Sequence, residues 1–119
     1  MILVDTSVWV DHLRTGDTRL AGLLDEGRVL THPFITGEIA LGSLKQRRLV
    51  LDALADLPQA RIADDGEVLH FIESNGLAGT GIGYIDAHLL AAVRLEAGST
   101  ILTRDKRLAR VALRLGLAA

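Results

Sequence analysis

A short apolar run, Ile2 to Val4, opens the chain and is followed directly by Asp5 and by two hydroxyl residues, Thr6 and Ser7. Such a run is too short for a helix and is typical of a strand that is buried on both faces of a parallel sheet. The carboxyl ends of parallel strands open into the crevice where ligands bind, so Asp5 lies where chemistry would be expected. Capping of the next helix is the commoner role for an acid in this position, and it stays the alternative.

Short apolar runs alternate with helical patterns along the rest of the chain. Further strands are predicted at 29–31, 61–63 and 100–103. Helices are predicted at 8–13, 20–24, 34–44, 49–57, 67–73, 84–97 and 105–115, with Asp65 as a candidate cap for the helix at 67–73. This alternation, in a chain of 119 residues, predicts an α/β fold: a single-domain three-layer α/β/α sandwich with a short parallel sheet.

The composition excludes several classes of site. There is no cysteine, so disulfides, thiolate metal sites and a cysteine nucleophile are excluded. The formal net charge of −2 is not that of a protein that binds nucleic acid through charge alone. The opening apolar run is interrupted by Asp5, and no export signal or membrane-spanning segment is visible, so we expect a cytoplasmic protein that does not enter a membrane.

Two acids interrupt the apolar pattern of the helices to which they belong. Glu38 lies three residues after Ile35, and Asp86 lies three residues before Leu89, so both are expected on inward-facing stripes. A carboxylate on a buried stripe is unfavourable unless it is paired or binds a metal. For each acid alone, a buried ion pair or a partly exposed position is as good an explanation as a site.

Asp105 repeats the arrangement seen at Asp5, because it follows the predicted strand at 100–103 and begins a helix. Two acids at strand ends and two on inward helix faces, Asp5, Asp105, Glu38 and Asp86, can meet at one edge of a parallel sheet. Their mutual repulsion is explained if a hard divalent cation neutralises them. Mg²⁺ takes oxygen ligands and keeps waters for chemistry on phosphates.

Other motifs are less specific. The glycine-rich stretch 79–83 lacks the Gly-Lys-Ser/Thr ending of a phosphate-binding loop and is interpreted as a flexible lead-in to the next helix. The four histidines show no metal-ligand spacing. Arg107, Arg110 and Arg114 share one face of the last helix, where a solvated surface is the default interpretation and contact with RNA the alternative.

Taken together, the acids and their flanking residues resemble the PIN-domain ribonucleases, and more narrowly the VapC-type toxins of bacterial type II toxin–antitoxin pairs. The segments that carry the resemblance are Leu3-Val4-Asp5-Thr6-Ser7-Val8-Trp9, His32-Pro33 before Gly37-Glu38, Gly83-Tyr84-Ile85-Asp86-Ala87-His88, and Thr103-Arg104-Asp105-Lys106-Arg107-Leu108. They span the whole chain in order, without departure at the four acidic positions. The fold implied is one PIN domain over residues 1–119.

The activity that this resemblance implies is that of a Mg²⁺- or Mn²⁺-dependent endoribonuclease that cuts structured RNA, tRNA or rRNA, and so arrests translation. It also implies a homodimer and a cognate VapB-type antitoxin, whose carboxyl-terminal segment enters the acidic cleft, often with an arginine. A guanidinium in an acidic pocket would exclude a complex of metal and phosphate.

The resemblance also assigns roles to the residues. Asp5, Asp86 and Asp105 would hold the metal directly or through waters, and Glu38 would be a further ligand or would orient the attacking water. The hydroxyls of Ser7 and Thr103 would hold those carboxylates in place.

Two other classes of function stay as alternatives. A receiver-like phospho-switch needs an acidic pair after the first strand and a phosphoacceptor Asp at the end of the third, whereas Thr6 follows Asp5 here and the candidate third strand ends in Asp64-Asp65. A non-catalytic interaction module would leave Glu38 and Asp86 on apolar stripes without an explanation.

Overall fold

Three short parallel strands form the centre of the computed structural model, which describes all 119 residues. The strands are β1 (Ile2–Val4), β2 (Val29–Leu30) and β3 (Thr100–Leu102), in the order β2-β1-β3. In the register of the sheet, Leu3 pairs with Leu30 on one side and with Ile101 on the other. All of β1 is buried, as expected for a strand that is covered on both faces.

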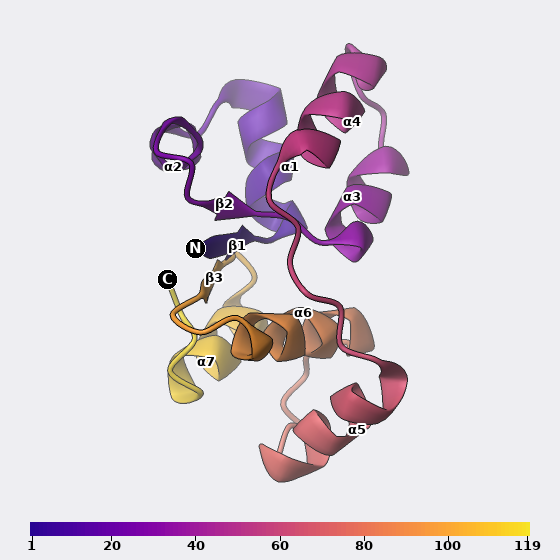
Figure 1. Ribbon diagram of the computed structural model, residues 1–119, viewed down its shortest axis with the longest axis vertical. Coiled ribbons are helices and arrows are strands. Elements are labelled where there is room, and N and C mark those ends of the chain that lie inside the picture. The colour runs from indigo at the N-terminus through magenta and orange to yellow at the C-terminus, as the bar shows by residue number, and fades with distance from the viewer.

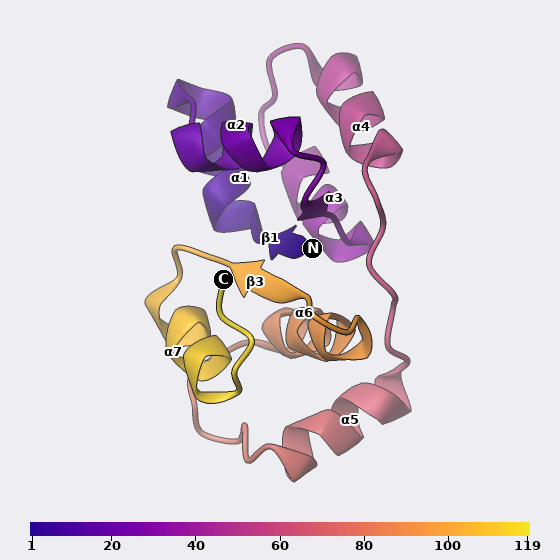
Figure 2. The same cartoon turned by 60° about the vertical axis from the view of Figure 1, so that its left-hand side comes forward.

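Seven helices cover the sheet. On one side lie α1 (Thr6–Thr15), α2 (Thr18–Asp25), α3 (Pro33–Ala40) and α4 (Arg47–Asp56) (Figure 1). On the other side lie α5 (Asp65–Ser74), α6 (Tyr84–Leu95) and α7 (Lys106–Arg114), and the turned view separates the two groups clearly (Figure 2). The predicted three-layer α/β/α architecture is therefore confirmed. None of these helices combines the length and the apolar character that a bilayer crossing needs.

Helix α6 is the central element of the helical layer that also contains α5 and α7. Every residue from 87 to 93 is buried, because the helix packs against β3 on one side and α5 on another. Leu89 and Leu90 are fully buried and belong to a core that is mostly aliphatic. A helix buried all round is held rigidly, so the side chains at its amino end have a fixed support.

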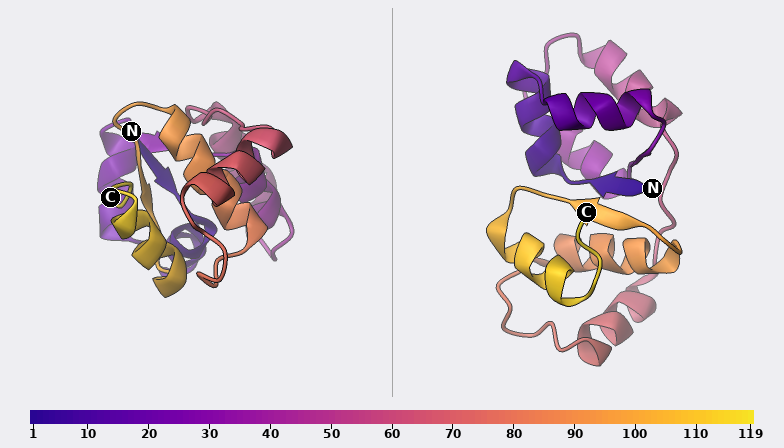
Figure 3. Two further views of the ribbon diagram at one scale, coloured as in Figure 1. Left: turned by 90° about the horizontal axis from the view of Figure 1, so that it is seen from below. Right: turned by 90° about the vertical axis from the view of Figure 1, so that its left-hand side faces the viewer.

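Both chain termini lie near the sheet (Figure 3). Met1 precedes β1, and the last residues run beside β3, where Ile101 donates to the carbonyl of Leu117 and accepts from Ala119. Because all strands are parallel, their carboxyl ends share the opposite edge. Asp5 follows β1 at that edge, and Thr103 follows β3.

The predicted strand at 61–63 is wrong. That segment forms no strand, and the sheet is extended next to β2 only by a single bridge between Thr31 and Gln59. Ile62, which gave the segment its apolar signal, is 59% exposed, whereas a strand in this position would be buried. The interpretation of Asp64-Asp65 as a strand end is lost with it.

The end of α3 and the cap of α5 also differ from the prediction. Helix α3 ends at Ala40 and does not reach residue 44, so Leu41, which the pattern placed inward, is 90% exposed. The residue that caps α5 is Asp64 and not Asp65, because Asp64 accepts from the backbone N–H of Glu67 while the Glu67 side chain accepts from Asp64.

Candidate active site

Asp5 ends β1 and precedes α1, but its carboxylate does not cap that helix. The side chain is only 8% exposed, and its Oδ2 accepts hydrogen bonds from the hydroxyls of Ser7 at 2.8 Å and Thr103 at 2.7 Å. The other oxygen, Oδ1, accepts no hydrogen bond within the protein. The capping alternative is therefore wrong for Asp5, and one of its oxygens stays free for a ligand.

The two hydroxyls that hold Asp5 are themselves fixed by backbone amides. The N–H of Arg104 donates to Ser7 Oγ at 3.0 Å, and the N–H of Asp105 donates to Thr103 Oγ1 at 3.0 Å. Each hydroxyl oxygen thus accepts from the backbone and has its hydrogen available for Asp5. The loop after β3 is therefore tied directly to the carboxylate after β1.

Asp105 does cap its helix. Its Oδ1 accepts from the backbone N–H of Leu108 at 3.0 Å, at the start of α7. The side chain is exposed, and its second oxygen has no protein partner. Capping and a role in a site are compatible here, because the cap uses one oxygen and fixes the direction of the other.

Glu38 lies on α3 and is exposed, so the prediction that it faces inward is wrong. The apolar stripe that suggested burial ran from Ile35 to Leu41, and Leu41 lies beyond the end of the helix and is exposed. Glu38 instead points toward the start of α1, where its Oε1 accepts from the hydroxyl of Thr6 at 2.8 Å. Thr6 follows Asp5 directly, so this contact brings Glu38 to the neighbourhood of Asp5.

Asp86 lies in the first turn of α6 and is half-buried. Burial is the main cause that raises its pKa, and the N–H of Gly83, which donates to Asp86 Oδ2 at 3.2 Å, works in the opposite direction. The carboxylates of Asp5, Asp105 and Glu38 raise the pKa of Asp86 further. Four acids from four separate segments are therefore close enough for their charges to interact.

The donor chemistry of this acidic cluster, defined as Asp5, Glu38, Asp86 and Asp105, fits a hard divalent cation. Its free groups are carboxylate oxygens, which Mg²⁺ and Mn²⁺ prefer, and no sulfur or imidazole takes part. No three acidic or histidine side chains of the protein are gathered tightly enough to hold a metal as they stand. Four like charges near one another repel, and a divalent cation bound among them would relieve that repulsion.

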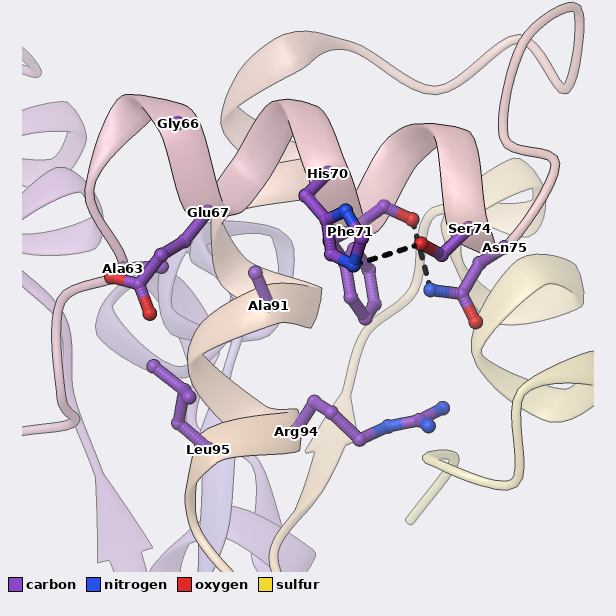
Figure 4. Close-up of a pocket in the computed structure, with 10 residues that line it drawn as sticks. All are labelled: Ala63, Gly66, Glu67, His70, Phe71, Ser74, Asn75, Ala91, Arg94 and Leu95. Atoms are coloured by element: carbon purple, nitrogen blue, oxygen red, sulfur yellow. Dashed lines mark hydrogen bonds between the residues drawn. The ribbon is translucent and has the colours of Figure 1, made fainter.

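A surface hollow of the protein lies away from the acidic cluster. It has a volume of about 620 Å³, and it is formed between α5 and α6 (Figure 4). Its lining residues are Ala63, Gly66, Glu67, His70, Phe71, Ser74, Asn75, Ala91, Arg94 and Leu95. Within it, the Arg94 guanidinium lies 5.8 Å from the centre of the Phe71 ring. None of the four acids contributes to this hollow.

Two residues with contacts at the cluster were not assigned a role from the sequence. Thr6 bonds Glu38, as described above, and Arg104 forms ion pairs with Asp11, at 3.1 Å, and with Asp17. The signal available for both was adjacency, since Thr6 follows Asp5 and Arg104 separates Thr103 from Asp105. Their partners lie in other helices, which spacing along the chain does not reveal.

Comparisons with known proteins agree with this arrangement. The PIN domain family model matches residues 2–113. Two curated relatives, both named Ribonuclease VapC32, come from Mycobacterium tuberculosis strains CDC 1551 / Oshkosh and ATCC 25618 / H37Rv. Each is 48% identical over 118 residues, which is 99% of this chain and 95% of the relative. The chain therefore belongs to the PIN-domain family, and within it to the VapC type of ribonuclease.

Proposed function

We propose that this protein is the toxin of a type II toxin–antitoxin pair and that it acts as a Mg²⁺- or Mn²⁺-dependent endoribonuclease on structured RNA, tRNA or rRNA, arresting translation. The observation that carries the proposal is the electrostatic convergence of Asp5, Glu38 and Asp105 on Asp86. Acids brought together from four segments, in an all-oxygen donor set, are typical of a metal-dependent phosphodiesterase site.

In this proposal the free oxygens of Asp5, Asp86 and Asp105 hold the cation. The hydroxyls of Ser7 and Thr103 orient the carboxylate of Asp5, and the backbone N–H groups of Leu108 and Gly83 orient those of Asp105 and Asp86. Glu38 either completes the ligand set or orients the water that attacks phosphorus. A bound cation would activate that water and offset the charge that develops on the phosphate.

Two partners are part of the proposal. The first is a VapB-type antitoxin, whose arginine would occupy the acidic cluster in place of the cation. The second is another copy of this chain. Exposed apolar side chains on α4, on the segment after it and on α5, namely Leu49, Ile62 and Leu69, support such a homodimer. These three elements follow one another down one side of the molecule (Figure 1).

The receiver-like alternative has no support. It requires a phosphoacceptor aspartate at the end of a third strand, and residues 61–63 form no strand. An interaction module without catalysis would explain neither the charge convergence at Asp86 nor the identity with named ribonucleases.

The test is to express the wild type and the Asp86→Asn variant in cells without antitoxin, at matched protein levels. We expect growth arrest by the wild type only, with new RNA 5′ ends that map the cleaved molecule. Glu73→Gln, which removes an exposed acid from α5 outside the cluster, serves as the control and should arrest growth like the wild type. Equal RNA cleavage by wild type and Asp86→Asn in vitro would exclude this site.

A further inference from the structure

Helix α7 carries four cations and no acid. Lys106, Arg107 and Arg114 each lie three or four residues from Arg110, so the four side chains share one surface of the helix, the α7 cationic face. All four are exposed. In a chain whose formal net charge is −2, this concentration of positive charge is a local departure from the rest of the molecule.

The α7 cationic face is unfavourable within the protein itself. Lys106 and Arg107 occupy the first turn, where the helix dipole disfavours cations, and like charges three and four residues apart repel one another. Lys106, Arg107 and Arg110 form no ion pair or side-chain hydrogen bond in the structure, and only Arg114 is engaged, with the carbonyl of Asn75 at 2.8 Å.

Helix α4 shows how such charges are usually compensated. It also begins with two arginines, but Arg47 donates to the carbonyl of Ala40 at 2.7 Å and Arg48 pairs with Asp52 at 3.2 Å. Lys106, Arg107 and Arg110 of α7 lack such partners. A cluster of positive charges that is unfavourable within the protein and has no acidic neighbour indicates a binding partner outside the protein. That partner must be an anion.

The α7 cationic face begins at the acidic cluster. Asp105 is the cap of α7, and Arg107 is the second residue of the helix. The Arg107 side chain lies across Gly81, where the backbone has a φ of +86° and an added Cβ would come within 3.0 Å of Arg107 Cδ. Gly81 precedes by two residues the N–H that bonds Asp86. Arg107 therefore lies between the segments that carry Asp86 and Asp105.

The dimensions of this face suit a polynucleotide. From Arg107 to Arg114 the helix rises about 10 Å, which accompanies about three nucleotides at 3.4 Å per stacked nucleotide. A row of cations that starts at the cleavage centre and runs away from it matches a strand whose scissile phosphate lies at the acidic cluster.

We propose that the α7 cationic face binds the phosphates of the RNA strand adjacent to the cleavage point, with Arg107 and Arg110 as the principal contacts. This inference rests on the proposed ribonuclease function. The acidic cluster by itself repels RNA, and the α7 cationic face supplies the attraction that the net charge of the chain does not.

The test compares two double variants that lower the net charge equally. Arg107→Gln/Arg110→Gln removes two charges from α7, and the control Arg14→Gln/Lys45→Gln removes two exposed, unpaired charges from α1 and from the loop after α3. Those control elements lie on the other side of the sheet from α7 (Figure 1). The probe is purified total tRNA in EDTA, so that binding is measured without cleavage, at several salt concentrations.

We expect the α7 variant to bind the tRNA about fivefold more weakly or worse at moderate salt, and the slope of log Kd against log salt to decrease by roughly 1 to 2. The control should keep most of the wild-type slope. The α7 variant removes repulsion between like charges, and it removes a cation from the first turn of the helix, so its melting temperature should not fall. An unchanged melting temperature would show that weaker binding results from lost RNA contacts and not from unfolding.

The outcomes distinguish this inference from the proposed function. Equal weakening by both double variants, or by neither, overturns the α7 inference, even if the wild type cleaves RNA with Mn²⁺. Unchanged tRNA binding with lost binding of an acidic protein segment would overturn it in favour of a protein partner. If no form of the protein cleaves RNA with Mn²⁺, the proposed function fails, and the tRNA affinities still decide what α7 binds.

Discussion

Thr103 donates a hydrogen bond of 2.7 Å to the carboxylate of Asp5, although 98 positions separate the two residues in the chain. The contact is possible because β1 and β3 are neighbouring parallel strands, so the residues that follow them meet at one edge of the sheet. Asp5 thereby obtains a donor without using the helix N-terminus beside it. The geometry of the acidic cluster depends on this link between the two ends of the sequence.

Removing the Thr103 hydroxyl should destabilise the protein and impair metal binding together. In Thr103→Val, the buried carboxylate of Asp5 loses one of two donors, and the N–H of Asp105 loses its acceptor, so we expect a loss of about 1–3 kcal/mol of unfolding free energy. Urea denaturation and a Mn²⁺ titration measure the two effects. Thr103→Ser keeps the hydroxyl and should behave like the wild type. Equal Mn²⁺ affinity in Thr103→Val and wild type would contradict this role.

Neutralising Asp86 should stabilise the metal-free protein while abolishing its response to metal. The pKa of Asp86 is raised in the folded state, so its ionisation opposes folding, and stability falls as the pH rises from the unfolded value of 3.8 to the higher folded value. Above that range the penalty is fully present, and Asp86→Asn removes it while keeping an acceptor for the N–H of Gly83. We expect a higher melting temperature in EDTA at pH 7 than for the wild type.

The same variant should no longer be stabilised by millimolar Mn²⁺, whereas the wild type should gain stability as the cation relieves the repulsion. Glu73→Gln is again the matched control. A lower melting temperature for Asp86→Asn in EDTA would show that the repulsion inferred at this site is absent.

The sequence was sufficient for the architecture because the signals for it are local. The apolar runs of β1 and β3 and the long pattern of α6 follow from burial, and the structure confirms them. The strand expected at 61–63 failed because a single exposed residue, Ile62, dominated a short apolar run. The length of α3 was overestimated for a related reason, since an exposed Leu41 is indistinguishable by pattern from a buried one.

Only part of the site could be predicted from the sequence. Asp5 and Asp105 could be placed at strand ends, because parallel strands share a carboxyl edge. The orientation of Glu38 could not be predicted, because it depends on a hydrogen bond from Thr6, which lies 32 positions away in the chain. Likewise, no spacing rule shows that Asp105 caps α7 whereas Asp5, in the equivalent position, does not cap α1. Tertiary partners decide these choices, and local propensity is silent about them.

Arg104 should act as a positioning residue for the acidic cluster. Its guanidinium joins Asp11 of α1 to Asp17, the cap of α2, and its backbone N–H holds Ser7. In Arg104→Gln the loop that carries Thr103 and Asp105 loses this tie, so we expect a weaker affinity for Mn²⁺, by about tenfold if the positioning is worth ~1.4 kcal/mol. The lysine of Arg104→Lys can pair with only one of the two acids. The Mn²⁺ affinity of this variant should therefore lie between those of the wild type and Arg104→Gln.

Loss of Arg104 also has a signature in the pH dependence of stability. The pKa of Asp17 is lowered, first by the backbone N–H of Leu20 and also by Arg104. A lowered pKa contributes stability that is present above the unfolded value of 3.8 and is lost as the pH falls through the folded value. Arg104→Gln should therefore lose stability at pH 7 and show a shallower decline below pH 4. An unchanged acid profile with unchanged Mn²⁺ affinity would mean that the ion pairs are only surface contacts.

His32 should make the protein sensitive to mild acid independently of the cluster. The ring is fully buried, its Nδ1 accepts from the N–H of Phe34 at 3.0 Å, and its Nε2 has no partner. Burial, with a further contribution from His88, lowers its pKa from 6.5 to about 4. Because the unfolded chain binds this proton more readily, stability is complete above pH 6.5 and falls as the pH decreases toward 4.

The variant His32→Asn keeps a side-chain acceptor for the N–H of Phe34 but cannot be protonated in this range. Its unfolding free energy should therefore change less between pH 7 and pH 5 than that of the wild type, even though the smaller side chain lowers stability at both pH values. Exposed His70, on α5, supplies the control variant His70→Gln, which should keep the wild-type difference. If His32→Asn and wild type lost the same stability on acidification, the proton would be taken up elsewhere.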